Sequence, residues 1–183
     1  MLLDIALLKY YLSFRDLYLA LGLVTLSDRP NRYPLPLISN LLDSPCKAHI
    51  YTKINLWHAY YLVHIAKGDG WKTTFQTHYR AFKWLVMPFG LTNALAVFQH
   101  FINNMFSNLL DICIVVYLND ILIYSNEITQ HWSHIKEVLK QLHRLELYTK
   151  AEKCEFHSDS IEYLGYVLLP SGLTMSDAKV KTI

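Results

Sequence analysis

The sequence predicts an α+β fold, and three observations support this prediction. Two long segments place apolar residues at three- and four-residue spacing, which is typical of amphipathic helices. Short runs rich in β-branched and aromatic residues lie around them, separated by turn residues. Hydrophobic residues make up 52% of the 183 residues and charged residues 17%, which is enough apolar surface for one substantial core. Helices inserted between hairpins, without regular strand–helix alternation, favour the α+β class.

The two long helices carry clear boundaries and one apolar face each. Thr92 or Asn93 can cap the first helix, which is expected to run to about residue 110. Its apolar face consists of Ala94, Val97, Phe98, Phe101, Ile102, Met105 and Leu109. The second helix is expected over 129–146, with Ile135, Val138, Leu139, Leu142 and Leu145 facing inward. Shorter predictions are a helix over 37–42, a loop over 27–36 and a helix or mixed structure over 1–26.

Eight strands are expected, several of them paired in hairpins. They cover residues 51–56, 60–65, 73–77, 81–86, 112–117, 121–125, 154–156 and 162–168. A turn over 67–70 precedes the hairpin formed by 73–77 and 81–86. The strands over 112–117 and 121–125 flank a tight turn, which we expect to have Asn119 and Asp120 at its tip.

Composition excludes several classes of protein. The net charge of +2 and the pI near 8.3 are compatible with nucleic-acid binding but fall short of a basic footprint. Cys46, Cys113 and Cys154 form neither a disulfide framework nor a zinc pattern, which favours a reducing, intracellular compartment, cytoplasmic or nuclear. We expect no secretory leader, because no basic stretch precedes the apolar run at the N-terminus. We expect no membrane partner, because no uncharged apolar run of about twenty residues occurs.

The hairpin around Asn119 and Asp120 is the first candidate for chemistry. Nucleotidyl transfer uses two divalent cations about 4 Å apart, held by carboxylates on two adjacent strands. A buried hairpin with a polar tip fits the second of those strands. Taken alone, such a hairpin is more often only a turn, so composition and spacing leave both interpretations open.

Several further motifs give this hairpin a context. They are Tyr33–Ile38 (YPLPLI), Thr52–Leu56 (TKINL), Trp71–Thr73 (WKT), Met87–Ala94 (MPFGLTNA), Tyr117–Asp120 (YLND), Lys150–Phe156 (KAEKCEF) and Tyr163–Gly165 (YLG). In this order and spacing they resemble the reverse transcriptases of gypsy-type long-terminal-repeat retrotransposons. The resemblance covers about residues 31–183. It implies the palm of a right-hand polymerase with partial fingers and no complete thumb, and residues 1–30 as a divergent N-terminal part of the fingers.

The resemblance also implies roles for individual residues. Asn55 and Asn119 stand where the family has its two main metal-binding aspartates, and Asp120 matches a third, more peripheral carboxylate. Tyr60 matches the aromatic under the incoming sugar, although a core aromatic is an equal interpretation, and Phe89 with Gly90 matches the segment beside the nucleotide. Lys150, or Lys153, matches a lysine near the leaving pyrophosphate. Tyr163, Leu164 and Gly165 match the primer grip.

These matches define the expected ligands and their limits. The family implies Mg²⁺ or Mn²⁺, an RNA/DNA template–primer, a dNTP and other domains of a polyprotein. Asparagine offers a neutral carbonyl oxygen where the metal pair needs an anionic one. We therefore expect Asp120 alone to be a weak or lost metal site, and a degenerate, truncated and catalytically inactive copy. The alternative is a non-catalytic module that binds nucleic acid or pairs with an intact polymerase.

Overall fold

The computed structural model describes residues 33–88 and 90–181, and it confirms the α+β class. The helix or mixed structure expected over 1–26 lies outside the described residues, as does the first part of the loop over 27–36. Within the described ranges, no helix has both the length and the apolarity needed to cross a bilayer.

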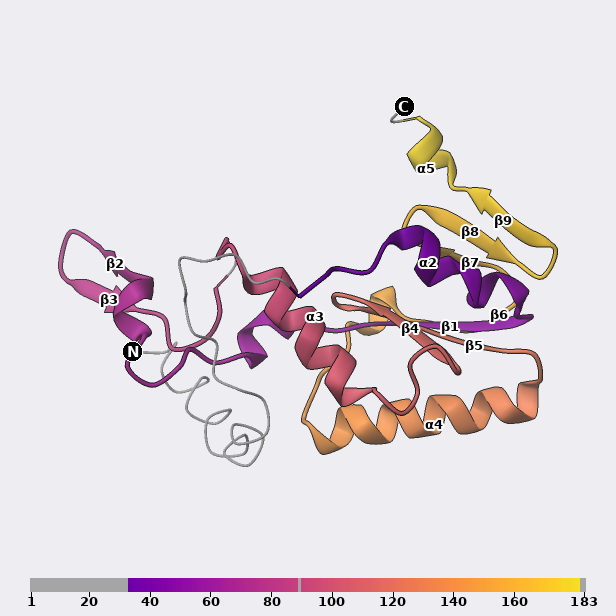
Figure 1. The fold of residues 1–183 in the computed structure, drawn as a ribbon, viewed down its shortest axis with the longest axis horizontal. Coiled ribbons are helices and arrows are strands. Elements are labelled where there is room, and N and C mark those ends of the chain that lie inside the picture. Colours follow the sequence, from indigo (N-terminus) through magenta and orange to yellow (C-terminus); the bar gives the residue numbers. More distant parts are fainter. Residues whose placement is uncertain (1–32, 89, 182–183) are drawn as a thin grey trace.

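A four-stranded antiparallel sheet forms the centre of the molecule (Figure 1), in the order β4-β5-β1-β6. Its strands are β1 (Ile50–Asn55), β4 (Ile114–Tyr117), β5 (Asp120–Ser125) and β6 (Glu155–Ser158). β5 pairs with β4 on one side and with β1 on the other, so it is central and almost fully buried. Its run Ile121–Tyr124 is apolar on both faces, as expected for a strand covered on both sides.

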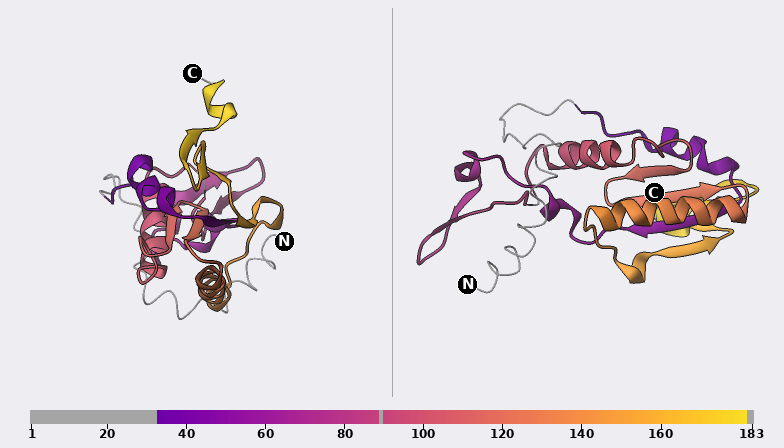
Figure 2. Two further views of the ribbon diagram at one scale, coloured as in Figure 1. Left: turned by 90° about the vertical axis from the view of Figure 1, so that its right-hand side faces the viewer. Right: turned by 90° about the horizontal axis from the view of Figure 1, so that it is seen from below.

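One face of the sheet is covered by two helices, α3 (Ala94–Met105) and α4 (Ile128–Arg144). Figure 2 shows α4 running along the sheet. The helices and the inward-facing strand residues form one apolar core, which includes Phe98, Ile102, Ile54, Ile121, Ile123, Ile135 and Val138. Alternation along β5 places Ile121 and Ile123 in this core and Leu122 on the opposite face.

The opposite face is covered by a short helix and a second sheet. α2 (Ile38–Asp43) and the 3₁₀ turn η1 (Pro45–Lys47) pack there together with β7 (Ile161–Tyr163) and β8 (Tyr166–Leu169). β9 (Gly172–Met175) extends that sheet, and α5 (Asp177–Val180) follows it. The apolar residues between the two sheets include Tyr51, Leu122, Ile161, Tyr163 and Leu168.

The chain also extends away from the central sheet at one end (Figure 1). This extension holds the 3₁₀ turns η2 (Ala59–Leu62) and η3 (Gly70–Thr73), and a two-stranded hairpin of β2 (Thr74–Gln76) and β3 (Ala81–Lys83). The hairpin confirms the prediction for 73–86, with shorter strands. A further 3₁₀ turn, η4 (Ala151–Lys153), leads into β6.

Two predicted elements were wrong in part. Residues 60–65 are mostly a 3₁₀ turn, because His58 adopts a left-handed φ of 51° after β1 and redirects the chain. Only its end pairs with another segment, through a bridge between His64 and Val86. α3 ends at Met105 rather than near residue 110, since Phe106 inserts fully into the core and the chain turns back toward β4.

The predictions for the C-terminal part were also incomplete. The strand expected over 162–168 is two strands, β7 and β8, because Leu164 and Gly165 adopt φ values of 52° and 78° and form a tight turn. Positive φ at both central positions is the type I′ geometry that suits a two-residue hairpin. β9 was not predicted at all.

Candidate active site

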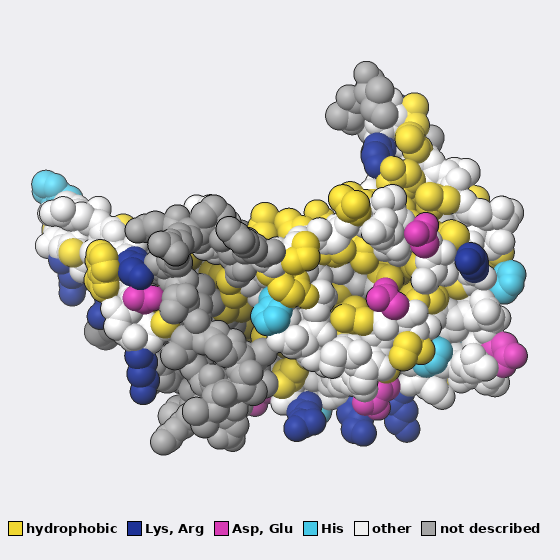
Figure 3. All heavy atoms as spheres, in the orientation of Figure 1, with side chains coloured by type: hydrophobic (Ala, Val, Ile, Leu, Met, Phe, Trp, Pro, Cys, Tyr) yellow, Lys and Arg dark blue, Asp and Glu magenta, His cyan; other side chains and the backbone are white. Residues whose placement is uncertain are grey.

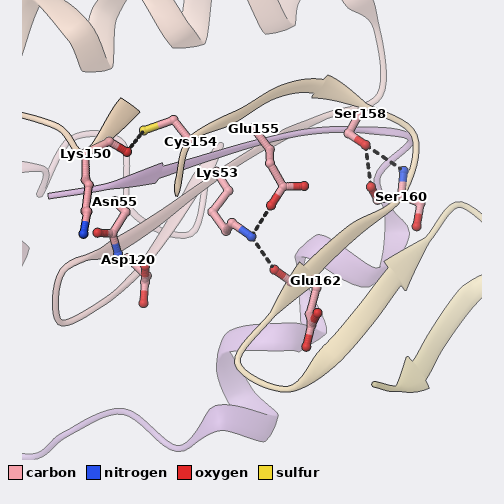
Figure 4. A network of polar contacts seen from close by, with 9 residues as sticks. All are labelled: Lys53, Asn55, Asp120, Lys150, Cys154, Glu155, Ser158, Ser160 and Glu162. Carbon is pink, nitrogen blue, oxygen red and sulfur yellow. Dashed lines mark hydrogen bonds and ion pairs between the residues drawn. The ribbon is translucent and has the colours of Figure 1, made fainter. Parts of the chain in front are cut away.

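The end of β1 and the start of β5 meet at the edge of the sheet. Asn55 and Asp120 are directly paired in the antiparallel register, so their side chains lie on the same face. The Asn55 side-chain amide donates a hydrogen bond of 2.5 Å from Nδ2 to Oδ1 of Asp120 (Figure 4). Asn55 is buried and Asp120 half-buried. The structure therefore brings together the first and third predicted positions.

The second predicted position, Asn119, lies in the turn that joins β4 to β5. The turn consists of Leu118 and Asn119, and not of Asn119 and Asp120 as predicted, because Asp120 already pairs with Tyr117. The Asn119 carbonyl accepts a hydrogen bond of 2.8 Å from the backbone N–H of Leu56. This bond fixes the turn against the end of β1, beside Asn55.

Gln99, on α3, is hydrogen-bonded to this turn, and the sequence did not lead us to predict its role. It is fully buried on α3, and its Oε1 accepts a hydrogen bond of 2.7 Å from the backbone N–H of Leu118. Its Nε2 donates to the Val116 carbonyl at 3.0 Å. Leu118 has a φ of 54°, which is strained for a residue with a Cβ. A glutamine three residues before Ile102, on the apolar side of the helix, was the available signal.

Lys150 lies next to Asn55, as Figure 4 shows. Its backbone N–H donates to the Asn55 carbonyl at 2.8 Å, and its ammonium group is 3.4 Å from the Glu152 carboxylate. Its side chain is about two-fifths exposed at 38%. The alternative candidate, Lys153, follows in η4, and its backbone N–H bonds to Lys150 instead of β1. Of the two lysines, Lys150 is the one bonded to the site.

The predicted primer-grip residues form the β7–β8 turn directly over the same sheet edge. Tyr163 is buried, and its hydroxyl donates a hydrogen bond of 3.1 Å to the backbone carbonyl of Asp120. Burial raises the pKa of Tyr163, and the nearby Asp120 charge raises it further, so the hydroxyl keeps the proton that it donates. Lys53 binds the Glu162 carbonyl at 3.0 Å and forms an ion pair with Glu155. The β7–β8 hairpin is thus bonded to both β1 and β5.

The other predicted nucleotide-binding residues lie elsewhere. Tyr60 is buried in the helix-side core, with its ring centroid 4.9 Å from that of Phe98, and burial raises its pKa. This position suits the interpretation as a core aromatic, while a contact with a sugar stays a prediction. Gly90 is exposed, has a φ of 93° and has open space where a Cβ would lie. Phe89 lies outside the described residues.

The donor atoms at the sheet edge are one carboxylate and two carboxamides. Asp120 supplies the carboxylate, and Asn55 and Asn119 the carboxamides. In residues 33–88 and 90–181, no group of three His, Cys, Asp or Glu side chains is arranged to hold a metal ion. The arrangement offers one carboxylate, already bonded to the Asn55 amide, where a pair of divalent cations needs several anionic oxygens.

The four-stranded antiparallel sheet, with two helices on one face and a polar hairpin tip at its edge, agrees with the expected palm of a right-hand polymerase. Solved structures share this fold. The foamy viral protease-reverse transcriptase in complex with an RNA/DNA hybrid aligns with a TM-score of 0.76 and 18% identity, over 84% of this chain and 21% of that chain. The foamy viral protease-reverse transcriptase dRH in complex with double-stranded DNA aligns with a TM-score of 0.77 and 19% identity, over 85% of this chain and 28% of that chain.

The sequence family agrees with the fold. Residues 17–168 match the family described as reverse transcriptase (RNA-dependent DNA polymerase), and the chain belongs to this family. It is 40% identical over 146 residues to the Transposon Tf2-3 polyprotein of Schizosaccharomyces pombe, and 39% identical over 146 residues to the Tf2-7 polyprotein. These matches cover 80% of this chain but only 11% of each polyprotein.

Proposed function

We propose that this chain is the reverse transcriptase domain of a retrotransposon polyprotein that keeps the palm and its grip on nucleic acid but cannot catalyse nucleotidyl transfer. The hydrogen bond from the Asn55 amide to the Asp120 carboxylate carries this proposal. The amide N–H occupies one oxygen of the single acidic side chain at the tip. In an active site of this class, a divalent cation would need that oxygen.

The donor set does not fit a pair of divalent cations. Two cations bring four positive charges, and replacing two carboxylates by carboxamides removes two negative charges from the site. Metal ions contribute several kcal/mol of charge stabilisation to such reactions, and about 1.4 kcal/mol corresponds to a factor of ten in rate. We therefore expect a loss of many factors of ten in the rate of primer extension.

The same substitutions leave the fold intact. A direct pair of carboxylates at Asn55 and Asp120 would repel without a cation, whereas the amide donates to the carboxylate. Asn119 lies in a turn, where asparagine is well tolerated. The grip hairpin stays bonded to Asp120 and Lys53 independently of any metal. These contacts support retained binding of a template–primer duplex.

Primer extension tests the proposal. A DNA primer on an RNA template would be offered with dNTPs and Mg²⁺ or Mn²⁺ to the parent chain, to Asn55→Asp/Asn119→Asp, and to the same double variant carrying Asp120→Asn as control. We expect extension by the double variant alone. Extension by the parent would contradict the proposal. If neither the parent nor the double variant extends the primer while both bind duplex, restoring the two carboxylates is insufficient. The two asparagines would then not be the sole cause of inactivity.

A further inference from the structure

Lys53 is a charged residue inside a strand, on a covered face of the central sheet. It lies on β1, where it is paired with Leu122 of β5 and with Glu155 of β6. Its side chain is only 18% exposed. Most lysines are exposed in folded proteins, and buried ones are paired. Figure 3 shows the usual situation, with Lys and Arg side chains gathered along the lower rim at α4, where Lys136 and Lys140 are exposed.

The Lys53 ammonium group links two sheets. It forms an ion pair with the Glu155 carboxylate on β6, and it donates a hydrogen bond of 3.0 Å to the backbone carbonyl of Glu162 on β7 (Figure 4). β6 belongs to the central sheet and β7 to the sheet that covers it. The carboxylate directs the ammonium group, because opposite charges attract more strongly in a partly buried site than in water. Lys53 therefore binds the backbone of β7 in a fixed direction.

The next residue along β7 makes another hydrogen bond to the central sheet. The Tyr163 hydroxyl donates to the Asp120 carbonyl at 3.1 Å. Glu162 and Tyr163 are consecutive, so one short segment is attached at two points, to Lys53 on β1 and to Asp120 on β5. Two points of attachment fix both the height and the orientation of the β7–β8 turn above the sheet edge. A single point would leave the turn free to pivot.

This attachment lies beside the candidate site without being part of it. Lys53 and Asn55 are two residues apart on β1, so their side chains share one face of the sheet at a spacing of roughly 7 Å along the strand. Figure 4 shows the Lys53 side chain directed toward Glu155 and Glu162. The lysine is thus placed to act on the hairpin above the site.

We propose that Lys53 is a positioning residue for duplex binding, which holds the β7–β8 hairpin at the height where Tyr163, Leu164 and Gly165 can contact a template–primer duplex. This role rests on the proposed function, in which the hairpin still binds a duplex. Lys53 itself touches no nucleic acid. Glu155 acts only by directing Lys53, and the carboxylate of Glu162 has no part, because Lys53 binds the carbonyl of that residue.

Duplex binding is the first test, measured by fluorescence anisotropy with a labelled DNA duplex. Lys53→Met keeps a long unbranched side chain but removes the ammonium group. It should weaken binding about 10-fold, because a hydrogen bond from a charged donor contributes about that factor. The slope of log K against log salt should stay as in the parent, since no phosphate contact is lost. A lysine that bound a phosphate directly would reduce the slope by about 0.9.

A second variant perturbs Lys53 from its exposed partner. Glu155→Gln should weaken duplex binding less than Lys53→Met does, and it should add nothing in the Lys53→Met background, because it acts through that lysine. The matched controls are Glu162→Gln, which keeps the carbonyl that Lys53 binds, and Lys140→Met, which removes an exposed lysine of α4. Both controls should bind like the parent. Thermal unfolding verifies that every variant is folded at the temperature of the binding measurement.

Hydrogen exchange measures the attachment of the hairpin without nucleic acid. Lys53→Met should speed amide exchange in β7 and β8 about 10-fold, because local opening no longer breaks the bond to Glu162. Amides of α3 and α4 should exchange as in the parent. A general loss of structure would instead speed exchange in these helices as well, and would contradict a local positioning role.

The remaining outcomes separate the inference from the proposed function. Unchanged exchange in β7 and β8, unchanged duplex binding, or a reduced salt slope in Lys53→Met would each overturn the inference. So would an effect of Glu155→Gln that persists in full without Lys53. A parent that binds no duplex would contradict the proposed function instead, and the exchange rates would still decide whether Lys53 positions the hairpin.

Discussion

The two faces of the central sheet accommodate buried polar groups in different ways. On the helix-covered face, they are neutral and fully enclosed. Thr52 and Ser125, on β1 and β5, are bonded to the two ring nitrogens of His131 on α4 at 2.8 Å and 3.0 Å. On the hairpin-covered face, Asp120 and Lys53 lie near the sheet edge, in contact with Asn55, Tyr163 and Glu155.

We infer that the polar groups on the helix-covered face serve mainly stability, whereas those on the hairpin-covered face lie at the candidate site. Neutral, fully bonded groups under the helices fix the register of β1, β5 and α4, because each would leave partners unsatisfied if moved. Asp120 and Lys53, under the β7–β8 hairpin, lie at the candidate site and are only partly buried. Substitutions should therefore cost most stability on the helix-covered face.

Gln99 should give the largest effect on stability. Gln99→Ala removes a hydrogen-bond partner of the part-buried Leu118 N–H and of the buried Val116 carbonyl. Each unsatisfied backbone group costs about 1–3 kcal/mol, so the free energy of unfolding should fall by about 3 kcal/mol. Chemical denaturation measures it, with Gln130→Ala at an exposed position of α4 as control. If Gln99→Ala and Gln130→Ala lower the free energy of unfolding equally, the buried bonds of Gln99 do not contribute the expected stability.

Acid should destabilise the helix-covered face next. Burial, together with His157 and His134, lowers the pKa of His131 to about 4. The unfolded chain binds a proton below about pH 6.5, whereas the folded chain resists it, so stability is full above pH 6.5 and falls toward pH 4. At about pH 5 the loss should be about 2 kcal/mol relative to about pH 7.5. Denaturation at both pH values measures it.

His131→Gln is the control for this pH dependence. The variant should be less stable than the parent near neutrality, but it should lose the additional decrease between about pH 7.5 and about pH 5. A parent whose unfolding midpoint changes no more with pH than that of the variant would show that His131 is not the group responsible.

The hairpin-covered face should give the smallest effect on stability. Gly165 has a φ of 78°, and a Cβ there would lie 3.0 Å from Cδ of Lys179. Gly165→Ala should cost about 1–2 kcal/mol, because left-handed backbone is unfavourable for alanine. Gly70→Ala, where a Cβ would meet Lys83 at an ordinary 3.4 Å, is the control in thermal unfolding. A larger loss than for Gln99→Ala would reverse the order of the two faces.

Hydrophobic periodicity in the sequence predicted the regular strands and the long helices. β1, β4, β5 and both long helices have strong periodicity, and the structure confirms them within a few residues. The left-handed turn at Leu118 could not be predicted, because a glutamine 19 residues away in the sequence stabilises it. The first residue of the β7–β8 turn is an apolar leucine, so Gly165 alone marked the turn. His131 gave no signal, because its hydroxyl partners come from two distant strands.

The site could be predicted mainly through the family resemblance. Asn55 and Asp120 are 65 residues apart, and no spacing rule brings them together. The order of the motifs placed both at one sheet edge, and the structure does the same. The bond from Tyr163 to the Asp120 carbonyl adds what the motifs did not contain, namely a direct hydrogen bond between β7 and the start of β5.

The most direct test is Mg²⁺ binding, monitored by thermal unfolding. It asks whether Asn55, Asn119 and Asp120 can bind a divalent cation in the parent chain. The parent and Asn55→Asp/Asn119→Asp would be titrated with Mg²⁺ under identical conditions. We predict no saturable change in the parent midpoint. The double variant should start lower, because adjacent carboxylates repel, and should be restored by Mg²⁺. Saturable stabilisation of the parent by Mg²⁺, abolished by Asp120→Asn, would contradict the account.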